Sequence, residues 1–116
     1  MQDYRKLVVW QKGMVFTKLI YRLTRLFPKE EMYGLTSQIR RAAVSVVGNI
    51  VEGRGKATDK DFLRFLYISR GSLNEVECYL ELAKDLEFIN VVQYEFIYKK
   101  CRELGFLLYK LIKSLE

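Results

Sequence analysis

A chain of 116 residues is long enough for one domain and too short for two, so we expect a single domain over residues 1–116. Half of the residues are hydrophobic and 14% are aromatic, which excludes an intrinsically disordered chain. The formal net charge of +6 favours an anionic partner, and the absence of histidine removes the most common general base and metal ligand.

The first predicted helix runs from about Tyr4 to Phe27 and ends before Pro28, because proline disfavours helical geometry in the residue before it. Its expected core seam has three- and four-residue spacing: Val8, Val15, Phe16, Leu19, Leu23 and Leu26. The second predicted helix begins between residues 30 and 36, with Gly34 able to set off a short turn, and ends near Gly53. Its expected core stripe is Leu35, Ile39, Ala42, Ala43, Val46 and Ile50.

Thr58, with Asp61 three residues later, predicts the N-terminus of a third helix that extends to about Phe88. Its inward face is Phe62, Phe65, Leu66, Leu73, Val76, Leu80 and Ala83. Asn90 and Gln93 predict the cap of a fourth helix, with the seam Tyr94, Ile97, Cys101, Leu104, Leu108, Leu111 and Leu115. Four helices joined by short connections predict an all-α, antiparallel up-down-up-down four-helix bundle.

The third and fourth helices carry more apolar residues than one bundle core requires. Exposed apolar area of this size usually marks an interface, so we predict self-association rather than merely a wide apolar face. The predicted oligomer-interface residues are Tyr67, Tyr79, Leu82, Leu86, Phe96, Phe106 and Tyr109.

Basic residues are concentrated on the first helix, where Lys18, Arg22, Arg25 and Lys29 fall in one stripe. The bundle topology brings the starts of the second and fourth helices to the same end. Such a cluster can neutralise several phosphates of RNA or DNA. The predicted nucleic-acid-binding residues are Lys18, Arg22, Arg25, Lys29, Arg41, Lys99, Lys100 and Arg102.

The basic stripe also has three possible roles that involve no nucleic acid. The cations can stabilise a helix C-terminus, confer solubility, or pair with the acidic third helix of a neighbouring subunit. Residues 59–90 contain seven acids against four bases, and the first and third helices are expected to lie diagonally within one bundle. Arg40 differs from the rest of the basic residues, because its apolar neighbours predict partial burial and a partner.

No motif predicts an enzyme, and we expect no catalytic residue, no metal site and no cofactor. The Gly53–Thr58 segment follows a helix. If Gly55-Lys56 belonged to a phosphate-binding loop, glycine would be required at Ile50 and Ser or Thr at Ala57. Cys78 and Cys101 form no paired motif, which fits a reducing cytoplasm. The longest uncharged run, residues 42–51, is too short to span a bilayer, so no membrane contact is expected.

Four segments resemble the ribosomal (23S rRNA) intervening-sequence protein family of four-helix bundles, some of them encoded within bacterial 23S rRNA genes. The segments are VWQK (residues 9–12), IYRLTRLFPKEEMYGLTSQIRRAAVS (20–45), GNIVEG (48–53) and DFLRFLYISRGSLNEVECYLELAKDLEFI (61–89). The sequence departs from the family pattern at Val47-Gly48, where a proline and a small residue are more usual, and at Val51, which replaces alanine. We therefore expect a straighter second helix.

The resemblance implies a ring-like homopentamer without established enzyme chemistry. A distantly similar bundle, the accessory protein of diversity-generating retroelements, is a basic pentamer that binds nucleic acid and a reverse transcriptase. By this analogy we predict a non-enzymatic nucleic-acid-binding accessory protein, with RNA as the expected partner. The alternative is an oligomeric scaffold whose charged faces contact other subunits or a partner protein.

Overall fold

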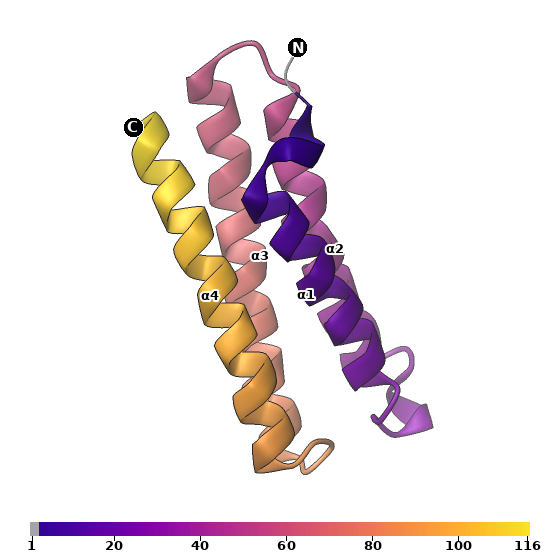
Figure 1. Ribbon diagram of the computed structural model, residues 1–116. Coiled ribbons are helices and arrows are strands. Elements are labelled where there is room, and N and C mark those ends of the chain that lie inside the picture. The colour runs from indigo at the N-terminus through magenta and orange to yellow at the C-terminus, as the bar shows by residue number, and fades with distance from the viewer. Residues whose placement is uncertain (1–2) are drawn as a thin grey trace.

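The computed structural model describes residues 3–116 as four long helices, α1 (Val8–Thr24), α2 (Leu35–Arg54), α3 (Asp59–Asp85) and α4 (Val91–Leu115). Consecutive helices run in opposite directions (Figure 1). Each helix packs on two neighbours, and within residues 3–116 no Cα atoms of the diagonal pairs α1–α3 and α2–α4 lie within 8 Å of each other. The predicted antiparallel four-helix bundle is confirmed. None of the helices in this part of the chain is long and apolar enough to cross a membrane.

The first predicted helix is wrong at both ends. Tyr4–Lys6 forms a separate 3-10 turn, and Leu7 is extended (φ −75°, ψ 122°) before α1 begins. At the other end, the amide of Phe27 donates to the Thr24 carbonyl at 3.1 Å, so the chain tightens into a turn before Pro28. A further 3-10 turn, Lys29–Glu31, precedes Gly34 and α2. The sequence suggested such a short turn before the second helix.

The buried face of α1 also differs from the prediction. Phe16 is buried as expected, but Val8, Val15 and Leu26 are 53%, 54% and 56% exposed. The core instead takes Val9, Phe16, Ile20 and Phe27, while Leu19 and Leu23 are partly buried. Close packing on α2 favours this rotation, because a Cβ added at Gly13 would lie only 2.8 Å from Val47 Cγ1.

Small residues let α2 and α3 approach closely. The hydroxyls of Ser45 and Ser72 are hydrogen-bonded at 2.8 Å, and Ser69 Oγ donates to the Val46 carbonyl at 2.7 Å. The predicted core stripes are confirmed: all six residues on α2 are buried, and on α3 only Phe65 is partly exposed. Helix α2 continues without interruption through Val47 and Gly48.

The turn after α3 begins earlier than the predicted end at Phe88. Glu87 adopts the left-handed conformation (φ 63°), and the Phe88 amide donates back to the Ala83 carbonyl at 2.9 Å. This turn directs the Phe88 ring towards Phe27, with ring centroids 5.6 Å apart, so the two turns at this end of the bundle are joined.

The predicted start of the fourth helix is confirmed in detail. Asn90 Oδ1 accepts from the Gln93 amide at 2.8 Å, and Gln93 Oε1 accepts from the Asn90 amide at 2.9 Å. Four residues of the predicted seam, Ile97, Cys101, Leu104 and Leu108, are buried, and the other three are partly buried. Ile112, which the sequence assigns to the surplus apolar set, is in the core.

Candidate functional site

The outward surface of α1 carries a row of three exposed cations, Lys18, Arg22 and Arg25. They follow one another at four- and three-residue intervals, which places them on one side of the helix, about 6 and 4.5 Å apart along its axis. No acidic side chain in residues 3–116 forms an ion pair with any of them. We call these three residues the α1 cation row.

A shallow hollow of about 440 Å³ lies beside the row, on the flank of α1 next to α2. All three cations line it, together with the Tyr21 ring and Val44. The guanidinium of Arg40 lies over this ring, 4.7 Å from its centroid.

A second hollow, of about 240 Å³, lies on the other flank of α1, next to α4. Arg22 lines it as well, with Phe96 and Ile97 of α4. Phe96 is 54% exposed, and the Lys100 ammonium lies 5.6 Å from the centre of its ring. The cation row therefore has one aromatic side chain on each flank.

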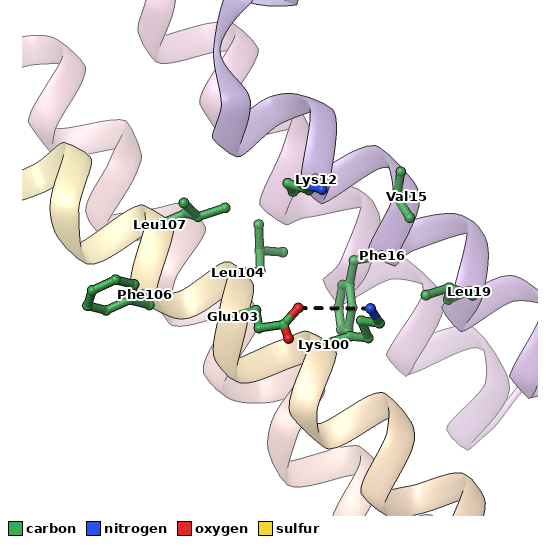
Figure 2. Close-up of a pocket in the computed structure, with 9 residues that line it drawn as sticks. All are labelled: Lys12, Val15, Phe16, Leu19, Lys100, Glu103, Leu104, Phe106 and Leu107. Atoms are coloured by element: carbon green, nitrogen blue, oxygen red, sulfur yellow. Dashed lines mark ion pairs between the residues drawn. The ribbon is translucent and has the colours of Figure 1, made fainter.

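Further along the seam between α1 and α4 is an apolar cavity of about 280 Å³ (Figure 2). Phe16 and Leu104 lie between the two helices there, whereas Phe106 points away from α1 (Figure 2). Lys100 and Glu103 form an ion pair at 4.0 Å at its edge. The other lining residues are Lys12, Val15, Leu19 and Leu107.

The structure separates the eight basic residues selected from the sequence. Lys18, Arg22 and Arg25 share one surface, Lys100 approaches it from α4, and Lys29 is exposed in the turn that follows α1. Arg102 lies on the opposite flank of α4, where its Nη1 is 3.4 Å from Glu77 Oε1 of α3.

The other two of the eight basic residues, Arg41 and Lys99, do not belong to the surface of the row. Arg41 precedes Ser45 by one turn, and Ser45 contacts Ser72, so Arg41 lies on the α3 flank of α2. Lys99 is exposed on α4 but lines neither hollow.

The seven predicted interface residues also occupy more than one surface. Phe106 and Tyr109 line a hollow between α3 and α4, and Tyr67 Oη donates to Glu116 Oε1 at 3.0 Å. Leu82 and Leu86 are exposed on α3, Phe96 lies beside α1, and Tyr79 is partly buried against the core.

The sequence interpretation missed the apolar surface of α1. Val8, Val15 and Leu26, which were expected in the core, are exposed instead. A signal for the correct face was present, because Val9, Gly13, Phe16, Ile20 and Thr24 also recur every three or four residues.

Among residues 3–116, the pKa shifts of four groups have clear physical causes. Hydrogen bonds to Glu116 and Glu75 raise the pKa values of Tyr67 and Tyr79, and burial raises the pKa of Cys101 to about 12. The backbone amide of Arg5 lowers the pKa of Asp3. Each shift moves the group further from neutrality. Within residues 3–116, no cluster of three or more Cys, Asp or Glu side chains could hold a metal ion.

Comparison with known proteins identifies relatives of this bundle. One relative is a protein of unknown function from the S23 ribosomal protein family of Bacteroides thetaiotaomicron, with which this chain shares 31% sequence identity. Its crystal structure superposes on this bundle with a TM-score of 0.82. The match covers 91% of this chain and 99% of that one. No curated protein matches. The family model of the 23S rRNA-intervening sequence protein matches residues 5–110, and the chain therefore belongs to that family.

Proposed function

We propose that the protein is a non-enzymatic nucleic-acid-binding protein that acts as a homo-oligomer, with RNA as its ligand. The observation that carries the proposal is the α1 cation row, whose three charges have no acidic partner within residues 3–116. Phosphates are the ligands for which such a row is suited, because each neutralised phosphate releases condensed counterions. RNA and DNA both present such phosphates, and RNA is taken as the ligand by analogy with the distantly similar nucleic-acid-binding bundle named above.

Phosphate contacts alone hold a nucleic acid without reading its sequence. The cations stand on the exposed side of α1, where phosphate contacts are the contacts that their charges support. We therefore expect affinity that depends strongly on salt and weakly on sequence.

The test is an RNA titration by fluorescence anisotropy over a range of KCl concentrations. Replacing Arg22 and Arg25 with alanine should weaken binding and lower the slope of log K against log [KCl] by up to about 2, since each phosphate contact contributes about 0.7–0.9. The matched control is Lys110→Ala with Lys113→Ala, which removes the same net charge from α4 outside both hollows. Equal losses in both double variants would show that net charge alone attracts RNA and would overturn the site.

The second candidate is an oligomeric scaffold, favoured by the apolar cavity between α1 and α4. On the diagonally opposite helix, α3 exposes Ile68, Leu82 and Leu86 together with the acidic Glu75. A basic apolar surface on one copy and an acidic apolar surface on another permit a head-to-tail contact that closes into a ring. The homopentamer implied by the family resemblance is one such ring.

Native mass spectrometry distinguishes the two candidates. If the protein is a scaffold, the double variant Arg22→Ala/Arg25→Ala should dissociate the ring. The single variant Glu75→Lys should dissociate it as well. Glu77 is unsuitable for this test, because it pairs with Arg102 of the same chain. A ring that survives both changes while RNA binding is lost supports the nucleic-acid-binding candidate. A broken ring, with no RNA binding by the unmodified protein, supports the scaffold.

A further inference from the structure

We propose that Phe96 is a stacking platform for an unpaired base, so that the ligand of the α1 cation row is single-stranded rather than duplex nucleic acid. This inference rests on the proposed nucleic-acid function and specifies the ligand of the same surface.

The first observation is the exposure of Phe96 beside unneutralised charge. The side chain is 54% exposed and shares a hollow of about 240 Å³ with Arg22, which has no ion-pair partner within residues 3–116. The rest of the hollow is apolar, formed by Leu19, Leu23 and Ile97. An aromatic side chain, apolar neighbours and one cation suit a nucleobase whose phosphate lies beside Arg22.

The second observation is a further cation on α4. Lys100 Nζ lies 5.6 Å from the centre of the Phe96 ring and 4.0 Å from a Glu103 carboxylate oxygen. The exposed aromatic side chain therefore shares a hollow with a cation of α1 and lies beside a second cation, which α4 contributes. Aromatic faces interleaved with cations are how proteins hold single strands, because every base has a face to stack and every nucleotide has a phosphate.

The third observation is the arrangement of the row itself. Lys18, Arg22 and Arg25 lie between the hollow of Phe96 and the hollow of Tyr21, and Arg22 lines both. A single strand can follow the row with its phosphates and turn its bases to either flank. A duplex keeps its bases stacked inside the helix and can use only the cations.

Electrostatic attraction alone predicts that the protein prefers a duplex to a single strand. A duplex has more phosphate charge per unit length, and its binding depends more steeply on salt than that of a single strand. Preference for a single strand therefore identifies stacking rather than electrostatic attraction.

The test compares a mixed-sequence single-stranded RNA of 12 nucleotides with its duplex at one salt concentration. The unmodified protein should bind the single strand more tightly. Phe96→Leu keeps an apolar side chain and should weaken that binding about 5- to 160-fold, the loss expected for one stacked base, while duplex binding changes little. The matched control is Tyr109→Leu, which removes an exposed aromatic 5.8 Å from Lys113 on the other flank of α4 and should leave both affinities unchanged.

A spectroscopic readout follows stacking directly. Phe96→Trp in a Trp10→Phe background places the sole tryptophan at the proposed platform, since Trp10 is the only one in the sequence. The single strand should quench its fluorescence, and the duplex should not. Before RNA is added, this tryptophan should be accessible to iodide. Protection that increases with protein concentration would show that a second copy covers Phe96, and would overturn the inference.

The remaining outcomes separate the two proposals. The stacking site is overturned if the protein binds single strand and duplex equally and Phe96→Leu changes neither affinity. If the double variant Arg22→Ala/Arg25→Ala then abolishes binding, the proposal of phosphate binding stands. Binding of neither RNA overturns both.

Discussion

Arg40 of α2 is joined to Thr24, the last residue of α1, by a hydrogen bond of 2.8 Å from its Nε to Thr24 Oγ1. The threonine hydroxyl in turn donates to the Ile20 carbonyl at 2.8 Å, and Arg40 Nη2 donates to the Tyr21 carbonyl at 3.4 Å. Arg40 therefore satisfies acceptors at the C-terminal end of α1. The sequence-based expectation that Arg40 is partly buried and paired is confirmed.

Arg40→Lys should lower the free energy of unfolding by about 1–2 kcal/mol. Lysine keeps the charge but cannot reproduce the planar guanidinium that bonds Thr24 and stacks on Tyr21. The midpoint of urea unfolding measures the change. Arg41→Lys is the matched control, because Arg41 is exposed on the next position of the same helix, and it should move the midpoint very little.

Glu87→Gly should stabilise the protein by about 0.5–1 kcal/mol. Glu87 is the only non-glycine residue with positive φ within residues 3–116, and glycine adopts that conformation without the steric cost of a Cβ. Urea unfolding with an unchanged slope measures the gain. Glu95→Gly, at an exposed position inside α4, should instead destabilise by about 1 kcal/mol, so a loss at both positions would contradict a steric cost at Glu87.

Two glycines should respond oppositely to substitution by alanine. A Cβ at Gly53 would lie 2.8 Å from Phe65 Cβ and 3.2 Å from the Phe62 carbonyl oxygen, so Gly53→Ala should cost about 1–3 kcal/mol. Gly71 has nothing within 4 Å of the added atom, and Gly71→Ala should stabilise α3 by about 1 kcal/mol. Thermal unfolding should shift in opposite directions for the two variants, and a shift in the same direction would show that close packing at Gly53 is not the cause.

The two cysteines should differ in reactivity. Cys78 is exposed, whereas Cys101 is buried and its pKa is raised from 9.0 to about 12, so its thiol stays protonated at pH 8. A thiol reagent should modify one cysteine in the folded protein and both in denaturant, with the rapidly modified site located by mass spectrometry.

The raised pKa of Cys101 also affects stability at high pH. The thiol ionises in the unfolded chain near pH 9.0 but resists ionisation in the folded chain until about pH 12. The contribution of the Cys101 thiol to the free energy of unfolding is therefore fully present below pH 9 and is lost as the pH rises towards 12. Cys101→Ala should cost stability at neutral pH and reduce this alkaline loss, as urea midpoints at pH 7 and pH 10 would show.

Local interactions account for most of what the sequence determined by itself. The Asn90–Gln93 cap, the break before Pro28 and the core stripe of α2 depend on residues within a few positions of one another. The cap and the break before Pro28 remain the same whatever packs around them. Four such segments with short connections leave few arrangements, so the bundle could be predicted before any contact was known.

Only tertiary packing decided which face of α1 is buried and which cations act together. Two apolar stripes on α1 satisfy the same periodicity, and the close approach of Gly13 to Val47 selects between them. Arg102 and Arg22 are the same residue type, yet Arg102 pairs with Glu77, whereas Arg22 lines a hollow with Phe96 and has no ion-pair partner within residues 3–116. These choices depend on residues that are far apart in sequence. The helical period places side chains around one helix, but only contact with the other helices decides how that helix is turned.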